Sequence, residues 1–372
     1  MHILILPSWY PTKEDPNNGI FFAEQAAALA EYGHQVSVVA LYGDSSHGLY
    51  IEEETRGRLR EFALHYRPLP FHLTYIRIIA AISGLLSKEL SENRPDLIHV
   101  HSFRATRYAR AIKALRDIPY VVTEHVSWFE RGLLSEKECR SAAAGYAHAS
   151  AVIAVSEGLR DQIAHLSPIP VRVVPNMVDD RFFLTDLKKH PGEGFRFLSI
   201  GSLNRNKGMD AVLEAFSEEL NSGNNATLTI CGDGEEREAL ERQASELGLG
   251  ANVCFTGQVS RAECAAYLSE CDAFVLASRV ETFGIVLAEA MACGRPVVMT
   301  KTGAWQTIVS VRTGLAVDVD DIPALSRAMQ SVVENAGKYD PKEIRTYCRD
   351  RFSARAICGS LTKIYEEVLG SP

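Results

Sequence analysis

Short apolar runs that alternate with longer helical patterns constrain this chain more than any other feature, because each run has the length of a buried strand. Strands buried on both faces are typical of parallel sheets covered by helices. The pattern therefore predicts an α/β protein built from parallel strand and helix units. The expected strands are residues 2–6, 35–41, 96–102, 119–125, 151–156 and 171–175 in the first half, and 195–201, 226–232, 252–257, 272–278 and 296–300 in the second.

A polar break separates these strands into two sets. The segment Thr185–Gly194 contains Pro and Gly and interrupts the apolar periodicity, so we expect a linker there. A chain of 372 residues also exceeds the usual size of a single core. We therefore predict two Rossmann-like domains, residues 1–185 and 186–352, facing each other across a cleft that encloses a ligand.

Two carboxylates, Glu281 and Glu289, surround the start of one helix in the second half of the chain. Ligands of open parallel sheets lie outside the carboxyl ends of the strands, so Glu281, just after the strand at 272–278, occupies the ligand end. Glu289 follows about two turns into the helix, where both carboxylates can reach one ligand rich in hydroxyl groups. The alternative is that Glu289 lies on a solvated helix face and Glu281 only favours the helix dipole.

The helix itself is bounded by sequence signals. Thr282 is a suitable N-cap, and the helix expected at Phe283–Cys293 ends at Gly294. The first amides of a helix have no intrahelical acceptor and attract anionic or oxygen-rich groups. We therefore expect a ligand to meet the backbone amides of Phe283, Gly284 and Ile285.

This segment resembles the Glu, seven residues, Glu motif of the retaining glycosyltransferases of family 4, which have the two-domain GT-B fold. The resemblance extends over nearly the whole chain, from the N-terminal loop to the last helix. It implies that Glu289 binds the ribose hydroxyls of a nucleotide and that Glu281 is a catalytic residue beside the donor sugar. It also implies that a C-terminal helix within residues 353–372 crosses back onto the first, acceptor-side domain, while residues 186–352 bind the nucleotide sugar.

A cationic loop follows the strand at 195–201, with Arg205 and Lys207 immediately before a helix. Two cations and a helix N-terminus would neutralise a diphosphate, although the glycine spacing of Walker and Rossmann loops is absent. The alternative is an exposed turn whose cations are solvated. In the family, an Arg and a Lys of this loop hold the donor diphosphate. Lys207 occupies the Lys position, whereas Ser202 occupies the usual Arg position, so Arg205 is expected to substitute.

The loop at 231–238 also follows a strand and contains Gly-Asp-Gly, but Glu235 and Glu236 at the helix start would repel a phosphate. A dinucleotide site is therefore not expected. The family resemblance places the nucleotide base near this loop and makes Val259 and Arg261 candidate base contacts.

Histidines gather at the ends of two strands in the first half. His99 and His101 share one face of the strand at 96–102, and Glu124 and His125 close the strand at 119–125. Imidazole and carboxylate groups suit zinc, but buried histidines more often form hydrogen bonds, and we expect no metal. The resemblance places His101 beside the donor sugar as a catalytic residue. It leaves His125 and Glu124 as acceptor contacts or as supports of the site.

Two further loops match the family incompletely. Gly19 matches the second glycine of a loop that approaches the diphosphate from the first domain, and Asn18 replaces the first glycine. Between residues 300 and 309, family members often have two glycines and a Glu, where this chain has Gly303, Ala304 and Thr307. These departures weaken the expectation of donor or acceptor contacts from the second loop.

Charge is distributed unevenly along the chain. The net charge of -8 argues against a general nucleic-acid binder, and no nucleic-acid partner is expected. Residues 56–116, however, contain 12 Lys and Arg against 4 Asp and Glu, and enclose the apolar segment Phe71–Leu86, which is too short to span a bilayer. One interpretation is a core helix flanked by solvated arginines. The other is a surface that docks on an anionic membrane or on a lipid-linked acceptor.

The remaining composition points to the cytoplasm. The eight cysteines form no CxxC pair and no small disulfide framework, which predicts reduced thiols. The apolar run at the N-terminus is too short for a secretory core and lacks a basic lead, so we interpret it as the first strand. We expect a cytoplasmic protein, peripheral on the membrane if the basic region docks there.

These features together predict a metal-independent, hexosyltransferase-like glycosyltransferase. It would move a sugar from a nucleoside diphosphate sugar, UDP-sugar in preference to GDP-sugar, to a carbohydrate or lipid-linked acceptor in glycan, polysaccharide or glycolipid biosynthesis. No cofactor is expected, and retention of anomeric configuration is implied by the resemblance alone. Two alternatives stay open: a sugar-nucleotide epimerase or hydrolase of the same fold, and a non-catalytic protein that binds nucleotide sugars.

Overall fold

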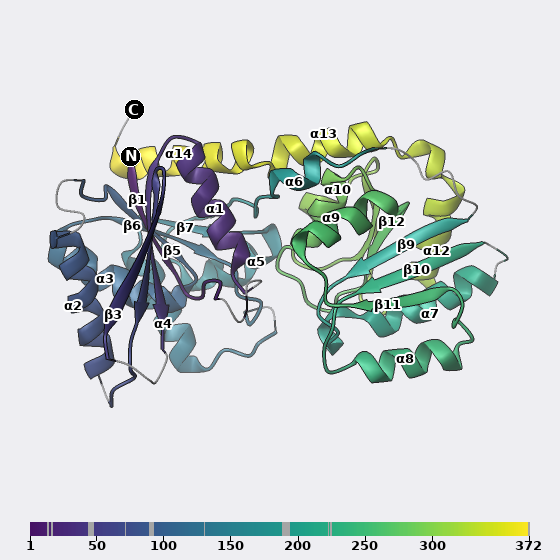
Figure 1. The fold of residues 1–372 in the computed structure, drawn as a ribbon, viewed down its shortest axis with the longest axis horizontal. Coiled ribbons are helices and arrows are strands. Elements are labelled where there is room, and N and C mark those ends of the chain that lie inside the picture. The colour runs from purple at the N-terminus through teal and green to yellow at the C-terminus, as the bar shows by residue number, and fades with distance from the viewer. Residues whose placement is uncertain are drawn as a thin grey trace. The chain divides into compact units, whose positions relative to one another are not determined.

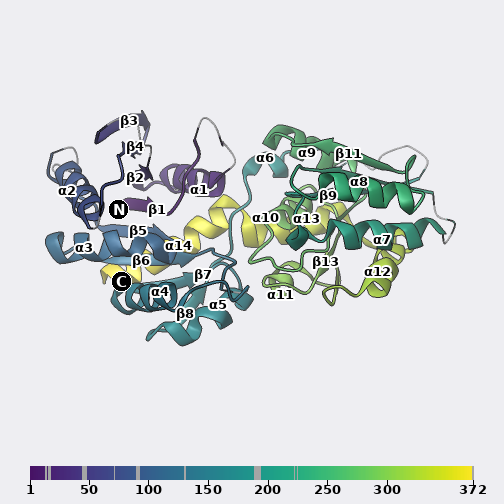
Figure 2. The same cartoon turned by 90° about the horizontal axis from the view of Figure 1, so that it is seen from below.

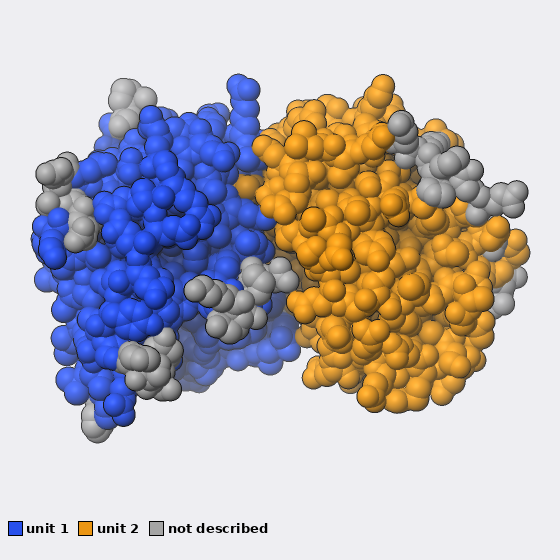
Figure 3. Space-filling model, viewed as in Figure 1, with its two compact units in different colours: residues 1–155, 159–175, 354–372 blue, residues 156–158, 176–353 orange. Residues whose placement is uncertain are grey.

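The chain folds into two compact α/β units in the computed structural model (Figure 1). The described residues are 1–12, 15, 18–43, 48–70, 72–88, 93–129, 131–187, 194–221, 223 and 225–370. Unit 1 comprises residues 1–155, 159–175 and 354–372, and unit 2 comprises residues 156–158 and 176–353 (Figure 3). The last helix, α14 (Ala354–Leu369), therefore belongs to unit 1. The predicted linker begins nine residues after Asn176, inside unit 2, and its residues 188–193 lie outside the described residues.

Unit 1 is built on an eight-stranded sheet with the order β3-β4-β2-β1-β5-β6-β7-β8. Neighbouring strands are parallel except for β3 and β4, which are antiparallel. The strands are β1 (His2–Pro7), β2 (Gln35–Tyr42), β3 (Tyr50–Arg56), β4 (Leu59–His65), β5 (Leu97–His101), β6 (Tyr120–Glu124), β7 (Ala151–Ala154) and β8 (Val171–Val173). The helices are α1 (Ile20–Glu31), α2 (Leu73–Lys88), α3 (Thr106–Arg116), α4 (Glu136–His148) and α14, while α5 (Glu157–Ile163) is divided between the units.

Successive strands are added to the sheet in opposite directions from β1, a central strand of this sheet. From β1 the chain moves through α1 to β2 on one side, and later from β5 through α3 to β6 on the other. Because such crossovers are right-handed, the two helices cover opposite faces. Helix α1 packs against α14, whereas α3 packs against α2 and α4, as Figure 2 allows the reader to follow. The buried residues of β1 and β5 thus lie between two helical layers.

Unit 2 is built on a six-stranded, fully parallel sheet with the order β11-β10-β9-β12-β13-β14. Its strands are β9 (Phe195–Ile200), β10 (Ala226–Cys231), β11 (Val253–Gly257), β12 (Ala273–Leu276), β13 (Val297–Thr300) and β14 (Gly314–Val317). Its helices are α6 (Asp180–Phe183), α7 (Met209–Asn221), α8 (Arg237–Glu246), α9 (Arg261–Glu270), α10 (Ile285–Ala292), α11 (Trp305–Ile308), α12 (Ile322–Glu334) and α13 (Pro341–Phe352). Here the direction in which successive strands are added to the sheet reverses between β9 and β12.

Every strand predicted from the apolar runs is present, but β3, β4 and β14 were not predicted. All seven residues of β3 are exposed, and three of them are consecutive glutamates, so no apolar run marks this edge strand. Strand β14 is only four residues long, and three of these residues are only partly buried. The prediction that the cysteines are reduced agrees with the structure, in which all eight are free thiols.

The start of α10 differs from the prediction. The N-cap is Gly284, with φ 72°, and not Thr282, so the helix begins at Ile285 rather than at Phe283. The reason is backbone geometry: a residue in the left-handed region cannot continue a right-handed helix, and glycine adopts that region without strain. Glu289 is consequently the fifth residue of the helix.

The apolar segment of the basic region forms α2, and Phe71 lies outside the described residues. One face of α2 is core, with Ile78, Ile82, Leu85 and Leu86 buried. The opposite face exposes Leu73 by 53% and Ile76 by 59%. Among the helices of the described residues, none combines the length and apolarity that a membrane span requires.

Candidate active site

The candidate site of unit 2 lies at the carboxyl ends of β9 and β12. Between these two neighbouring strands the order in which strands are added to the sheet reverses. In open α/β sheets such a reversal leaves a crevice between the loops of the two strands, and ligands bind there. The loop after β9 carries Arg205 and Lys207, and the loop after β12 carries Glu281. Strand order therefore brings together the predicted cationic loop and the first motif carboxylate.

Gly208 lets these two loops approach each other. It has φ 63°, and a Cβ placed on it would lie 2.0 Å from the carbonyl oxygen of Ala277. No other residue type fits so close to a backbone oxygen. The sequence places this glycine directly after Lys207, so the lysine is held against the end of β12.

Lys207 and Glu281 form an ion pair, with Nζ of the lysine 2.5 Å from Oε2 of the glutamate. The exposed fractions of the two side chains are 25% and 14%, so the pair remains open to a ligand. The sequence assigned these residues separately, the cation to a diphosphate and the carboxylate to a sugar. The structure shows that they share one place.

Arg279 was not predicted, although it organises the cationic loop. Its guanidinium donates to both carboxylate oxygens of Asp210 at 2.9 and 2.7 Å and to the carbonyl oxygen of Arg205 at 2.7 Å. Its backbone amide donates to the carbonyl oxygen of Asn206 at 2.7 Å, and its Nε lies 2.8 Å from Asp320 Oδ1. Burial opposes ionisation of Asp210, but the hydrogen bonds and charge of Arg279 lower the pKa of that carboxyl.

A cation two residues before Glu281 was the available sequence signal for Arg279, but nothing in the sequence pairs it with a loop some seventy positions away. Arg205 itself is exposed, and its carbonyl rather than its side chain is held. The predicted role of the Arg205 side chain stays a prediction.

Glu289 is buried, with 2% of its side chain exposed, and Nη1 of Arg261 lies 2.5 Å from its Oε1. The alternative that Glu289 decorates a solvated helix face is therefore wrong. Burial raises the pKa of Glu289, and the neighbouring Arg261 opposes this rise. The Arg261 guanidinium also lies 4.8 Å from the ring centroid of Phe182. Glu289, which is predicted to bind the ribose, and Arg261, which is predicted to contact the base, are thus in direct contact.

The amides at the start of α10 lie in the same loop as Glu281. The first bond of the helix runs from the Leu287 amide to the Gly284 carbonyl at 2.9 Å, so the amides of Phe283, Gly284 and Ile285 precede the helical ladder. Val259, partly buried, lies in the connection from β11 to α9, two residues before Arg261.

The carboxyl end of β1 is the corresponding place in unit 1, because the order of successive strands reverses there. Gly19 is the N-cap of α1, and a Cβ on it would lie 2.8 Å from Cδ1 of Trp9, which follows β1. One turn along, the ring of Phe22 lies 4.6 Å from that of His101 and 4.9 Å from that of His125. The structure therefore brings the predicted Gly19 and both histidines to one end of the sheet.

His101 is the last residue of β5 and is fully buried. Its Nδ1 lies 3.1 Å from Nε2 of His125, while its Nε2 is buried and has no hydrogen-bond partner among the described residues. Burial and the neighbouring His99 and His125 lower the pKa of His101 well below 6.5, which keeps the ring neutral. A neutral ring with one unpaired nitrogen is suited to hydrogen-bonding a sugar hydroxyl. Among the described residues, no group of three His, Cys, Asp or Glu side chains is arranged to hold a metal ion.

Glu124 is also fully buried and accepts four hydrogen bonds from the protein. Three come from the backbone amides of Phe103, His125 and Val126 at 2.9 to 3.1 Å, and one from the Tyr146 hydroxyl at 2.9 Å. These donors oppose the effect of burial, which raises the pKa of Glu124. The carboxylate fixes the loop that carries His125, an arrangement that favours the supporting role over direct acceptor contact.

The loop in which this chain departs from the family, residues 300–309, is tied within unit 2. The carbonyl of Gly303 accepts from the amide of Gly158 at 3.0 Å, and the hydroxyl of Thr307 donates to Glu157. The site residues proposed from sequence do not include these groups.

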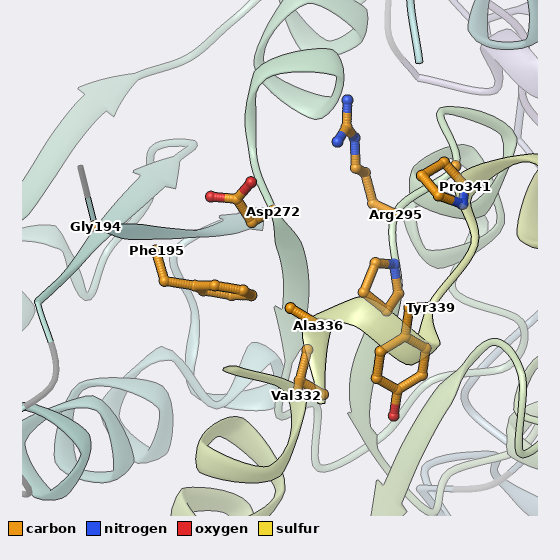
Figure 4. Close-up of a pocket in the computed structure, with 10 residues that line it drawn as sticks. Gly194, Phe195, Asp272, Arg295, Val332, Ala336, Tyr339 and Pro341 are labelled. Atoms are coloured by element: carbon orange, nitrogen blue, oxygen red, sulfur yellow. The ribbon is translucent and has the colours of Figure 1, made fainter. Parts of the chain in front are cut away.

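A pocket of about 150 Å³ lies elsewhere in unit 2 (Figure 4). Phe195, Asp272 and Pro296 line it, and all three stand at the starts of strands, at the opposite end of the sheet from Lys207 and Glu281. Its charged groups have protein partners: Arg295 donates to backbone carbonyls of Leu268 and Ser269, and Asp272 accepts from the Arg196 amide. The pocket is therefore separate from the candidate site.

Comparison with known proteins covers most of the chain. Residues 19–182 match the family model Glycosyltransferase Family 4, and residues 182–351 match Glycosyl transferases group 1. A glycogen synthase of Mycobacterium tuberculosis is 25% identical over 391 residues, covering 98% of this chain and 94% of that protein. The solved sucrose-phosphate synthase from Thermosynechococcus elongatus has a TM-score of 0.80, 20% identity and 100% coverage of both chains. Anabaena Alr3699/HepE in complex with UDP has a TM-score of 0.78 and 19% identity, covering 99% of this chain and 100% of that one.

Proposed function

This chain belongs to the glycosyltransferases of family 4 and has the GT-B fold, and we propose that it transfers a sugar from a nucleoside diphosphate sugar to a carbohydrate or lipid-linked acceptor. One observation carries the proposal. At the strand ends of unit 2, each of the two motif carboxylates is held by a cation, Glu281 by Lys207 and Glu289 by Arg261. Two such pairs in one unit supply both kinds of group that a nucleotide sugar needs, cations for phosphate and carboxylates for hydroxyl groups.

The diphosphate of the donor is proposed to bind Lys207 and the amides of Phe283, Gly284 and Ile285. A carboxylate alone would repel phosphate, but Glu281 is neutralised by its lysine. Lys207 has two further protons to donate, so it can hold Glu281 and a phosphate oxygen together. Arg279 keeps the loop in place, and the exposed Arg205 is proposed as a second cation. With these cations present, the proposed reaction uses no metal.

The ribose is proposed to bind Glu289, and the base to lie against Val259 and Arg261. A carboxylate can accept from two adjacent hydroxyl groups, and the ion pair with Arg261 favours the charged form of the buried Glu289. We propose a UDP-sugar donor in preference to a GDP-sugar. Support for a nucleotide in this fold comes from Anabaena Alr3699/HepE, which was solved with UDP.

The transfer breaks the bond between the anomeric carbon and the diphosphate oxygen, and the electron pair leaves with the diphosphate. The acceptor oxygen bonds to the anomeric carbon, and its proton passes to an oxygen of the leaving diphosphate. Lys207 and the helix amides stabilise the charge that develops on the leaving group. Glu281 and the unpaired Nε2 of His101 are proposed to hold the hydroxyl groups of the transferred sugar.

Retention of anomeric configuration is part of the proposal and is inferred from the family. A covalent double displacement would need a carboxylate against the anomeric carbon. In the proposed site Glu281 is paired with Lys207, which favours binding over nucleophilic attack.

The acceptor side is proposed to be unit 1. Helix α2 exposes Leu73 and Ile76 on the face opposite its buried residues, within the basic region of residues 56–116. An amphipathic helix with neighbouring cations suits an anionic lipid surface. We therefore propose a cytoplasmic enzyme that docks peripherally on membrane and acts on a carbohydrate or lipid-linked acceptor.

Product analysis tests the proposal. The purified chain is incubated with UDP-, GDP- and ADP-sugars, with and without an acceptor mixture, and nucleotide, free sugar and glycosylated product are measured. Transfer requires that nucleoside diphosphate release depends on acceptor and equals product formed. Release of free sugar without acceptor would instead identify a hydrolase, and isomerised donor an epimerase. Binding without any turnover would identify a non-catalytic binding protein.

A further inference from the structure

The C-terminal helix reaches the proposed catalytic strand through one buried hydrogen bond. The hydroxyl of Tyr365, on α14, lies 2.7 Å from Nδ1 of His99, on β5. Both side chains are completely buried, and 266 positions separate them in the sequence. Burial raises the pKa of Tyr365 well above its usual value and lowers the pKa of His99 to about 3. Both groups are therefore neutral at physiological pH, where neither gains nor loses a proton.

The ring of His99 is fixed at both nitrogens. Its Nε2 lies 2.7 Å from the hydroxyl of Thr123 on the neighbouring strand β6, opposite the Tyr365 contact. A neutral imidazole has one donor and one acceptor nitrogen, so one hydroxyl donates and the other accepts. Two hydrogen bonds at opposite sides of a planar ring prevent it from turning about its χ2 angle.

His99 in turn forms a wall of the His101 site. The two rings lie 4.3 Å apart between centroids, as expected for alternate residues on one face of a strand. Phe22 and His125 contact the His101 ring at 4.6 and 5.3 Å. Of these three neighbours, His99 is the one that Tyr365 of α14 holds by a hydrogen bond.

We propose that Tyr365 and His99 are positioning residues that fix the ring plane of His101, so that its unpaired Nε2 faces the transferred sugar. This proposal rests on the proposed function in one respect, the contact between His101 and the sugar. The C-terminal helix is then part of the catalytic support of unit 1 and does more than cover its sheet. Loss of the Tyr365 hydroxyl leaves one nitrogen of His99 unsatisfied, and the ring turns to find another partner.

The chain supplies a matched control on the same helix. Thr362, one turn before Tyr365, forms a second polar tie of α14, with Oγ1 lying 2.8 Å from Nε2 of His34. The ring of His34 lies 5.9 Å from that of Tyr32 and 6.5 Å from that of Tyr365 between centroids, and its bond to Thr362 involves no atom of His99 or His101. Thr362→Val therefore weakens the attachment of α14 without removing a hydrogen bond from His99.

The experiment compares Tyr365→Phe and Thr362→Val in the full chain. Tyr365→Phe should lower kcat about tenfold, the loss of one hydrogen bond at the reacting geometry, with the KM for donor within about twofold. Thr362→Val should leave both constants within about twofold. Equal losses of kcat in the two variants would overturn the proposal, because weaker attachment of α14 would explain both losses. Unchanged kcat in Tyr365→Phe would also overturn it, because the hydroxyl would then have no role in turnover.

A second measurement stands apart from turnover. In protein labelled with ¹⁵N-histidine, Tyr365→Phe should shift the ring nitrogens of both His99 and His101, and Thr362→Val should shift neither. Unchanged His101 signals in Tyr365→Phe would refute the positioning role. If the wild type transfers no sugar from any donor, the proposed function fails, and these shifts still decide whether Tyr365 orients His101.

Discussion

Arg261 and Glu289 form an ion pair in which Nη1 of the arginine lies 2.5 Å from Oε1 of a carboxylate that is only 2% exposed. A carboxylate so deeply buried would lose its charge without a partner. Burial raises the pKa of Glu289, and Arg261 opposes this rise, so the arginine favours the charged, accepting form of the carboxylate. Glu281 likewise has a cationic partner, Lys207, whose Nζ lies 2.5 Å from its Oε2.

Glu289→Gln should weaken binding of the preferred nucleoside diphosphate about tenfold or more. A hydrogen bond to a charged group contributes about 1.5 to 3 kcal/mol, and the amide offers one acceptor oxygen where the carboxylate offers two. Titration calorimetry measures the change. Because the substitution also leaves Arg261 without its carboxylate, circular dichroism must show that the variant is folded at the temperature used. Wild-type affinity in a folded variant would remove Glu289 from the nucleotide site.

Lys207→Ala should weaken the nucleoside diphosphate far more than the parent nucleoside. The lysine precedes α7 in a loop fixed by Gly208 and Arg279, and only phosphate needs its charge. Loss of one charged hydrogen bond predicts roughly a tenfold difference between the two ligands. Calorimetry with UDP and uridine provides the comparison. Equal losses for both ligands would indicate a general defect of unit 2.

Arg279→Lys should reduce affinity for nucleoside diphosphate although it preserves charge. Lysine cannot reproduce the bidentate contact with Asp210 together with the bond to the Arg205 carbonyl, so the cationic loop loses its fixed backbone. We expect about a threefold to tenfold weaker UDP, with uridine unaffected. Arg242→Lys, at an exposed position of α8, is the matched control and should change neither ligand. Unaltered UDP affinity in Arg279→Lys would show that the loop does not depend on this arginine.

The strands of this protein are readable from sequence because burial on both faces imposes continuous apolar runs. The exposed edge strand β3 carries Glu52, Glu53 and Glu54 and offers no such signal. The start of α10 was misplaced for a local reason: Thr282 has the side chain of an N-cap, but Gly284 adopts the left-handed geometry that ends the loop.

The residues of the candidate site could be proposed one by one from the sequence, but the ion pairs and hydrogen bonds between them could not. Motif spacing identified Glu281 and Lys207 separately, and their contact joins positions 74 residues apart. Such pairings follow from strand order, which periodicity does not specify. Arg279 and Tyr365 had no motif to mark them, since each acts by hydrogen-bonding groups that are distant in sequence.

His101→Ala should lower turnover at least about a hundredfold, the range for a positioned group that interacts in the transition state, and leave nucleoside diphosphate affinity nearly unchanged. Burial lowers the pKa of His101 well below 6.5, so the ring is neutral and gains no proton as pH falls through that value. The kcat of the wild type should therefore show no break attributable to His101 between about pH 6 and about pH 8.

Treatment with a chelator should leave kcat unchanged. Activity that is lost on chelation and restored by zinc would contradict the metal-independent reaction.

The last prediction concerns α2, which exposes Leu73 and Ile76 beside the cation Arg77. If unit 1 docks on membrane through this helix, the purified chain should float with vesicles of anionic lipid at low salt. Association should fall as salt screens the charges, because exposed charges lose most of their interaction within a Debye length of about 10 Å at 0.1 M.

Two charge reversals locate the surface. Arg77→Glu should weaken flotation without changing the melting temperature, whereas Arg242→Glu, on exposed α8 of unit 2, should leave flotation as in the wild type. A third variant, Ile76→Asn, tests the apolar contribution and should reduce flotation even at low salt, because an apolar side chain inserts below the charged headgroups. Equal association with neutral and anionic vesicles, or none at low salt, would make α2 an ordinary core helix and would favour a soluble carbohydrate as the acceptor.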